Sequence, residues 1–455
     1  MVTVTAGAVR GKVENGIASF LGIPYAAPPF GKDRFRKPRP HEPWAGELDC
    51  TAYGPTPPQA PYSGGLEKVL PSVIIEGEEI LNLNVWTPAG AIGGDELLPV
   101  MVWVYGGALT RGSNAISLYD GATFARDGVV LVAINYRVGL EGFASFPDTP
   151  GQNGLADAVA ALEWVHAEIA KFGGDPARVT VFGQSAGGGI VGALLGLPQA
   201  RGLFAGAIVM SAPIGPRGKP PRREVTALVA GSLGIPKTRE AFAEVPPAVL
   251  VDELSKLTGG GALIGGRASF APDPTLGDPW REIEAGANAD VPVIVGGTAE
   301  EFGLYLGPTG LRSRIKWYHL LLALVMFRPG PRRLRKLRSK TPEAGVADLF
   351  GAVASDGLIS RAAHRLAKLR ARRGGRTYVY EFGWRSTVLG LGAAHGLDIP
   401  FVFDALALPD ASMLAGDGAP QRLADEMHGA WVRFAKSADP GWPAWEGDGS
   451  AKVFA

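Results

Sequence analysis

One short segment combines a serine with the backbone freedom that a reactive hydroxyl needs. Residues 183–187, Gly-Gln-Ser-Ala-Gly, form a G-x-S-x-G pattern, in which a serine sits on a sharp strand-to-helix turn with its hydroxyl exposed. Val179 to Phe182 predicts a buried strand, and the small residues from Ala186 predict a closely packed helix. With 64 Gly and 19 Ser in 455 residues, chance supplies about 0.4 such matches, so this context is what favours Ser185 as a nucleophile over a surface serine in a glycine-rich turn.

A serine hydroxyl is a poor nucleophile at neutral pH, so it needs a base, an acid that orients the base, and donors for an oxyanion. The chain has six histidines, and five lie in proline-rich or helical stretches, where structural roles are commoner: His41, His166, His319, His364 and His428. His395 instead lies in a loop between small residues, after the serine, in the order typical of α/β-hydrolases. We predict that His395 is the general base that later acts as the general acid.

Three carboxylates compete to orient His395. Glu300 and Glu301 follow a predicted strand at 291–295, which suits an acid placed between the serine and the histidine. Asp398 lies only three residues after His395 and is better suited to bracing that loop. The residues alone leave the choice open.

Composition excludes several classes of protein. The net charge of +1 argues against a nucleic-acid partner, and 46% hydrophobic residues indicate an ordered globular chain. The single cysteine, Cys50, permits no internal disulfide, and the N-terminus lacks the pattern of a signal peptide, so we expect a cytoplasmic protein. The longest apolar stretch, 317–327, is too short to cross a bilayer. No metal constellation, phosphate loop or dinucleotide motif appears, and we expect no cofactor.

Predicted strands and helices alternate along the chain. Apolar strands are expected at 98–105, 129–136, 179–182, 207–210, 291–295 and 377–381, with a helix at 154–174. This alternation predicts an α/β fold with a mostly parallel central sheet between helices.

Two segments before the serine carry a family resemblance. GIPYAAPPFGKDRFRKP at 22–38 and EILNLNVWTP at 79–88 resemble the N-terminal signatures of the type-B carboxylesterase and cholinesterase family, in particular its bacterial para-nitrobenzyl-esterase-like members. The segment around His395 is similar to that family's histidine motif. The likeness extends over nearly the whole chain and is weakest at 215–290 and 305–375.

The resemblance implies a fold and a set of roles. It implies one α/β-hydrolase domain over 1–455, with cap-like insertions at about 215–290 and 305–375. It places the orienting carboxylate on Glu301, and the oxyanion donors on Gly107 and Ala108 together with Ala186. Ser211 matches a family serine that supports the catalytic serine, histidine and acid from behind. The alternative interpretation is a polar residue that only ends a strand.

The implied activity is hydrolysis of carboxylic esters through an acyl-enzyme, with a small-molecule ester and water as the partners. An amidase or carbamate hydrolase could use the same residues, because pocket shape selects the leaving group. A non-catalytic binding protein of the same family is the rival from another class, and the filled catalytic positions argue against it.

Residues 312–340 hold ten Lys or Arg and no Asp or Glu, around the apolar run that starts at Trp317. One hypothesis is an amphipathic cap element over the active site that touches a membrane surface or a lipid-like ester. The interpretation that we prefer from sequence is a cap helix with a solvated basic face.

Overall fold

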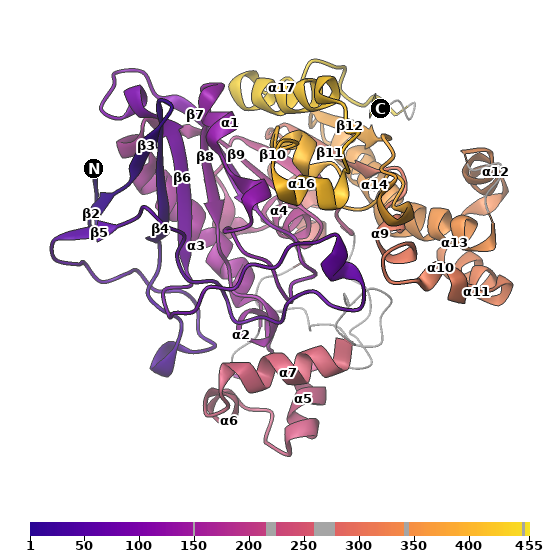
Figure 1. Cartoon of the computed structure of the whole chain (residues 1–455), viewed down its shortest axis with the longest axis horizontal. Coiled ribbons are helices and arrows are strands. Elements are labelled where there is room, and N and C mark those ends of the chain that lie inside the picture. Colours follow the sequence, from indigo (N-terminus) through magenta and orange to yellow (C-terminus); the bar gives the residue numbers. More distant parts are fainter. Residues whose placement is uncertain (149–150, 215–223, 259–277, 341–344, 448–450) are drawn as a thin grey trace.

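A ten-stranded sheet forms the centre of the molecule (Figure 1). The structure, a computed structural model, describes residues 1–148, 151–214, 224–258, 278–340, 345–447 and 451–455. The strand order is β13-β12-β11-β10-β9-β7-β8-β6-β4-β3, and β13 through β8 pair in parallel. The pairs β8-β6, β6-β4 and β4-β3 are antiparallel. The predicted α/β class with a mostly parallel sheet is confirmed.

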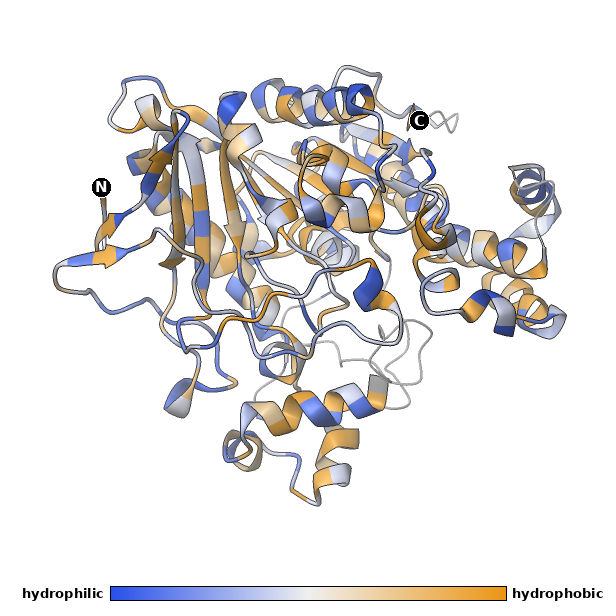
Figure 2. Cartoon of the chain, in the orientation of Figure 1, coloured by the Kyte–Doolittle hydropathy of each residue, from blue (hydrophilic) through white to orange (hydrophobic). Residues whose placement is uncertain are grey.

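The strands of the large sheet are β3 Lys12–Glu14, β4 Ile17–Pro24, β6 Asn82–Pro88, β7 Leu98–Val104, β8 Val130–Ile134, β9 Gly174–Gln184, β10 Gly206–Met210, β11 Val293–Thr298, β12 Thr377–Phe382 and β13 Lys452–Phe454. A smaller sheet holds β1 Val2–Val4, β2 Gly7–Arg10 and β5 Glu47–Asp49. Strands β7, β8 and β10 are buried along almost their whole length, which explains their continuous apolar runs (Figure 2).

Helices cover both faces of the sheet. One layer includes α1 Ala122–Arg126 and α17 Gln421–Ser437, and the other includes α3 Asn153–Glu168, α4 Ala186–Leu194, α8 Pro279–Ala285 and α14 Arg361–Ala371. Short helices α2 Gly139–Phe143, α9 Gly303–Leu306, α15 Ile399–Val402 and α16 Pro409–Leu414 lie in the connections. Because adjacent parallel strands need long crossovers, these helices are what place the carboxyl ends of β7, β9, β11 and β12 at one edge of the sheet.

Two groups of helices lie outside these layers (Figure 1). The first is α5 Val225–Leu233, α6 Arg239–Ala243 and α7 Pro247–Thr258, which share a small core with Phe35 and Phe146. The second is α10 Leu311–Arg314, α11 Trp317–Phe327, α12 Gly330–Lys340 and α13 Val346–Ser355, followed by a π-helical turn over Asp356–Ser360. They fall within the expected insertions at 215–290 and 305–375, of which 215–223, 259–277 and 341–344 lie outside the described residues.

Candidate active site

Ser185 occupies the turn between β9 and α4. Its φ of 57° and ψ of −121° lie outside the helical and extended regions, and its N–H donates to the carbonyl of Met210 at 2.9 Å. A side chain on Gly187 would overlap the carbonyl oxygen of Val104, so the helix approaches β7 only because this residue is glycine. The local sequence thus holds the Ser185 side chain at the sheet edge in one strained conformation.

His395 and Glu301 come from separate loops and meet beside this turn. Nδ1 of His395 lies 2.5 Å from Oε2 of Glu301, and the His395 backbone N–H donates to the Glu301 carbonyl at 3.3 Å. The other carboxylate oxygen accepts the backbone N–H of Thr298 at 2.8 Å. We assign the Nδ1–H tautomer to His395 because a carboxylate faces that nitrogen, which leaves the lone pair on Nε2.

The two rival carboxylates have other contacts. Glu300 pairs with Arg385 and accepts the backbone N–H of Ala393 at 2.9 Å. Asp398 is fully buried and accepts the Tyr380 hydroxyl at 2.9 Å. Burial, followed by the nearby charge of Glu301, raises the pKa of Asp398 to about 7. Of the three, Glu301 alone faces the histidine ring among the hydrogen bonds of the described chain.

Gln184 is a site residue that the sequence reasoning did not single out. It is the last residue of β9, it is nearly buried, and its Nε2 lies 3.2 Å from Nε2 of His395. Since Nε2 of the ring carries the lone pair, the Gln184 amide is the donor in this contact. A polar side chain directly before the nucleophile, at the buried end of the strand, is the signal that could have revealed it.

The loop after β7 brings backbone N–H groups to the same place. Gly107 and Ala108 have φ values of 120° and 57°, and a side chain on Gly106 would approach Cβ of Ser185 to 3.0 Å. Ala186 begins α4, so its N–H is among those at the helix N-terminus without an intrahelical acceptor. These groups can face an anion beside Ser185.

A cavity of about 530 Å³ joins these residues. Its polar edge contains the residues described above: Gly107, Ala108, Gln184, Ser185, Ala186, Glu301 and His395. Most of its remaining wall is apolar and includes Leu109, Phe143, Ile190, Phe302, Leu358 and Ile359. A large apolar cavity with a few polar groups at one end is the usual form of a small-molecule site.

Ser211 lies behind Glu301 rather than in the cavity. It is fully buried, and its hydroxyl has no hydrogen-bond partner within the described part of the chain. Both this hydroxyl and Oε1 of Glu301 lie within 3.0 Å of the position that a Cβ on Gly297 would take. The glycine therefore leaves room for the two side chains to approach each other.

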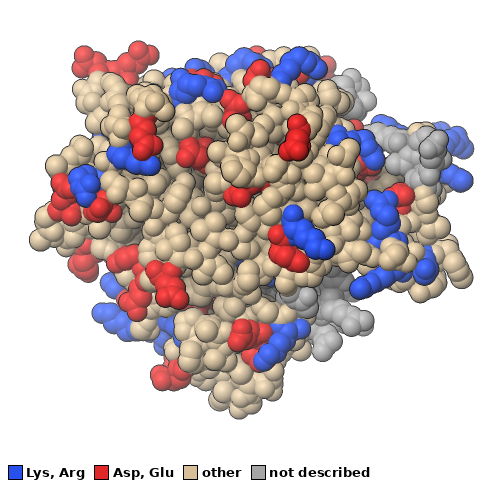
Figure 3. All heavy atoms as spheres, viewed as in Figure 1, with Lys and Arg blue, Asp and Glu red and all other residues tan. Residues whose placement is uncertain are grey.

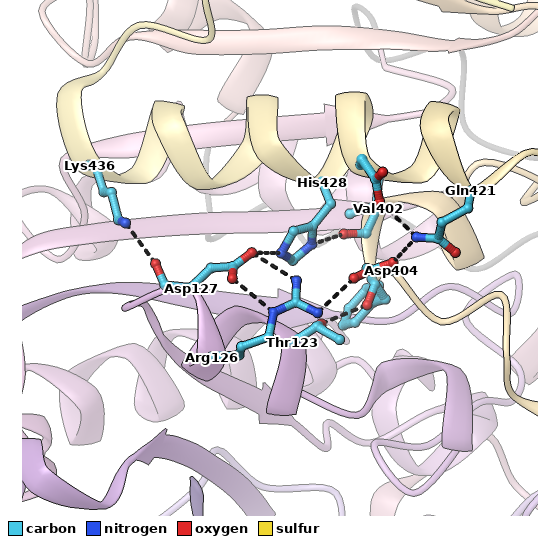
Figure 4. A network of polar contacts seen from close by, with 10 residues as sticks. Thr123, Arg126, Asp127, Val402, Asp404, Gln421, His428 and Lys436 are labelled. Atoms are coloured by element: carbon cyan, nitrogen blue, oxygen red, sulfur yellow. Dashed lines mark hydrogen bonds and ion pairs between the residues drawn. The ribbon is translucent and has the colours of Figure 1, made fainter. Parts of the chain in front are cut away.

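The other histidines lie away from this group, and His428 has a structural setting (Figure 4). Its Nδ1 lies 2.8 Å from the Val402 carbonyl and its Nε2 lies 3.0 Å from Asp127. Arg126 joins the same Asp127 to Asp404. These contacts fix α17 and α15 against α1, and α15 begins only four residues after His395.

No group of three or more His, Cys, Asp or Glu side chains in the described segments could hold a metal ion. None of the helices formed by the described residues is long and apolar enough to cross a membrane.

Comparison with known proteins identifies the family. The family model described as "Carboxylesterase family" matches residues 1–316, more than half of the chain. The chain belongs to the carboxylesterase family. The resemblance to the type-B carboxylesterase family is confirmed, and this carboxylesterase is a hydrolase of carboxylic esters.

Relatives of this carboxylesterase span nearly its whole length. The para-nitrobenzyl esterase of Bacillus subtilis is 33% identical over 98% of this chain and 92% of its own. The fumonisin B1 esterase of Sphingopyxis macrogoltabida is 32% identical over 99% and 85%. The crystal structure of a Geobacillus stearothermophilus carboxylesterase superposes with a TM-score of 0.85, at 31% identity over 100% of this chain and 95% of that one.

Proposed function

We propose that this carboxylesterase hydrolyses its esters through an acyl-enzyme on Ser185, with His395 as base and acid and Glu301 as the group that orients His395. The observation that carries the proposal is the 2.5 Å contact between Glu301 and Nδ1 of His395, in the same cavity into which Ser185 opens. The contact supports a ring that carries its proton on Nδ1 and its lone pair on Nε2, the nitrogen that accepts the serine proton.

The proposed reaction has two steps, formation of the acyl-enzyme and its hydrolysis. The Ser185 oxygen attacks the ester carbon while its proton passes to Nε2 of His395, and the resulting oxyanion collapses, expelling the alcohol, which takes that proton. Water then gives a proton to Nε2 of His395 and attacks the acyl carbon, and collapse releases the acid as Ser185 regains its proton. Glu301 stays ionised and stabilises the imidazolium in both halves.

Backbone N–H groups of Gly107, Ala108 and Ala186 stabilise the oxyanion in this proposal. Their positions around Ser185 support it, because these donors are fixed by the fold and need no reorganisation as charge develops. Loss of one such donor costs about 3 to 4 kcal/mol of transition-state stabilisation in comparable sites. Ser211 acts from behind by supporting the Glu301 carboxylate.

The cavity supports esters with a sizeable apolar acyl or alcohol group. Leu109, Phe302 and Ile359 offer apolar surface beside the polar edge, and burial raises the pKa of Tyr305, which keeps its hydroxyl protonated in the same wall. We place this activity in one α/β-hydrolase domain over 1–455, in the cytoplasm, with no cofactor.

The test is hydrolysis of a short-chain aryl ester, combined with labelling by an organophosphate that reacts with activated serines. We expect Ser185→Ala to lower kcat at least about 10⁴-fold and to abolish labelling. Ser437→Ala, an exposed serine on α17, is the matched control and retains both. A Ser185→Ala protein that still turns over and labels would refute the assignment, and faster hydrolysis of the matching amide would favour the amidase alternative.

A further inference from the structure

Helix α11 is apolar on its outer as well as its inner half. Of the fourteen large hydrophobic side chains that the described residues expose, six lie on this one helix, with exposed fractions between 52% and 67%: Trp317, Tyr318, Leu321, Leu322, Val325 and Met326. Their spacing of i, i+1, i+4, i+5, i+8 and i+9 gathers them on one half of the helix. Monomeric proteins seldom leave so concentrated an apolar face in water.

The opposite half of α11 is already in use. Ala323 is buried, and Leu320, Leu324 and Phe327 are partly covered where α11 packs against α13. The ring of Phe327 fills the space beside Gly357 in the turn after α13. The helix cannot rotate to hide its outer residues without losing this packing, so the exposed half is a fixed feature of the surface.

Basic side chains surround this apolar face. Exposed Lys or Arg residues precede α11, follow it and line α12: Arg312, Arg314, Lys316, Arg328, Arg332, Arg335, Lys336 and Arg338. Arg333 holds α12 in place through a 2.7 Å bond to Asp356. Figure 3 shows Lys and Arg gathered on the projection formed by α10 to α13. The interpretation that we preferred from sequence therefore describes α12 but not α11.

The cavity at Ser185 lies on the other side of this helical layer. Ser355, Leu358 and Ile359, at the end of α13 and in the next turn, line the cavity, and the lining contains no residue from 312–340 among those described. The segment is not a cap directly over the site, as one hypothesis had it. The outer surface of this segment therefore has no role in the proposed reaction and is accessible to a binding partner.

We propose that α11 and α12 form a docking surface for anionic lipid bilayers, in which the outer half of α11 enters the headgroup region and the flanking Lys and Arg contact lipid phosphates. The combination of an exposed apolar helix face with a dense positive charge is what such an interface attracts. At 11 residues α11 is too short to span a bilayer, so it lies along the surface.

The test is sedimentation of the full chain with lipid vesicles. We expect about tenfold more protein bound to phosphatidylcholine vesicles that contain about 30 mol% phosphatidylglycerol than to pure phosphatidylcholine, and weaker binding as salt rises. Vesicles with acyl chains brominated near the headgroup should quench Trp317 fluorescence, and Trp317→Phe should lose that part of the quenching.

Two double variants separate the apolar from the charged contribution. Leu322→Glu with Val325→Glu should abolish binding, and Arg332→Glu with Arg335→Glu should remove the preference for anionic lipid. Val13→Glu, an equally exposed position on β3 at the far edge of the sheet, is the matched control and binds as wild type. Retained ester hydrolysis shows that each variant is folded.

Three outcomes would overturn the proposal: no binding to anionic vesicles by the wild type, binding that the α11 variant leaves intact, or a concentration-dependent dimer that Leu322→Glu with Val325→Glu dissociates while vesicles bind nothing. The last outcome would assign the same surface to a second copy of the chain, and analytical ultracentrifugation distinguishes it.

Discussion

The side chains around His395 contact different atoms of the histidine ring and its loop. Glu301 faces Nδ1 and Gln184 faces Nε2, so both ring nitrogens have a partner before any substrate is present. Glu300 instead holds the backbone of the histidine loop, through the N–H of Ala393. Two adjacent glutamates thus act on the same loop in different ways, and this difference can be measured.

Replacing Glu301 with glutamine should lower kcat by about 10³- to 10⁴-fold, because a neutral amide neither fixes the Nδ1–H tautomer nor stabilises the imidazolium. Glu300→Gln keeps an oxygen for the Ala393 N–H and loses a partly exposed ion pair, so we expect kcat within about tenfold of wild type. Steady-state hydrolysis of an aryl ester compares the two. Equal losses in both variants would contradict the assignment of Glu301.

Replacing Gln184 with glutamate would set a carboxylate beside Nε2 of His395. A negative charge at that distance stabilises the imidazolium, so the rising limb of kcat/KM should move to higher pH by about one unit or more. Gln184→Leu removes the donor without adding charge and should move the limb by less than about half a unit. An unmoved limb in Gln184→Glu would mean that the side chain does not contact His395 in solution.

Whole elements hold these side chains in register. The turn at Ser185 depends on close approach of α4 to β7, and the histidine loop leads directly into α15, which α17 holds through His428. In Figure 4 the contacts of His428, Asp127 and Arg126 join helices that are about 300 residues apart in sequence. We therefore expect the site to be sensitive to changes well outside the cavity.

Removing the His428 ring tests this coupling between helices. His428→Ala removes one of the partners of the Asp127 carboxylate, leaves the Val402 carbonyl without its partner and opens a gap beside Phe124, so we expect the free energy of unfolding to fall by about 2 to 4 kcal/mol. His166→Ala, at an exposed position on α3, should change it by less than about 0.5 kcal/mol. Urea unfolding measures both, and similar small losses would contradict the structural role of His428.

The molecule as a whole combines one large sheet with two groups of helices outside its layers. The buried sheet contains the catalytic edge, whereas α11 and α12 face solvent on the far side of the α13 layer. The proposed reaction and the proposed lipid attachment therefore belong to different parts of the chain. The buried carboxyl group of Asp398 contributes to the stability of the sheet-containing part.

Stability should depend on pH through Asp398. Its pKa is about 7 in the folded protein and near 3.9 in an unfolded chain, so the folded state holds a proton that the unfolded state has released between these values. The contribution is fully present below about pH 4 and is lost as pH rises through about 7. Asp398→Asn removes this titration and should gain stability relative to wild type as pH rises, by up to about 1.4 kcal/mol per pH unit.

Urea unfolding between about pH 5 and 7.5 measures this difference, because the two states differ in bound protons between the unfolded and folded pKa values of Asp398. Asp425→Asn, at an exposed position on α17, is the matched control and should give a difference that does not vary with pH. A gap between Asp398→Asn and wild type that is constant across the range would contradict the raised pKa.

The sequence alone was enough for the fold class and the family, and it supplied the candidates for the nucleophile, the base and the orienting acid. Strands and helices can be predicted from the sequence because their apolar periodicity depends on neighbouring residues, and their alternation predicts a parallel sheet. The turn at Ser185 can be recognised because only glycine fits the crowded positions on either side of it. The sequence also limited the orienting acid to Glu300, Glu301 and Asp398.

The sequence alone does not determine which residues contact one another across the chain. The positions of Gln184 against His395 and of Tyr380 against Asp398 depend on how strands and loops far apart in sequence meet at the sheet edge. Helix α11 is apolar all round, so no periodicity says which half is buried; packing against α13 decides it and leaves the other half exposed. Burial and pairing are properties of the assembled fold, because a side chain's surroundings come mostly from residues distant in the sequence.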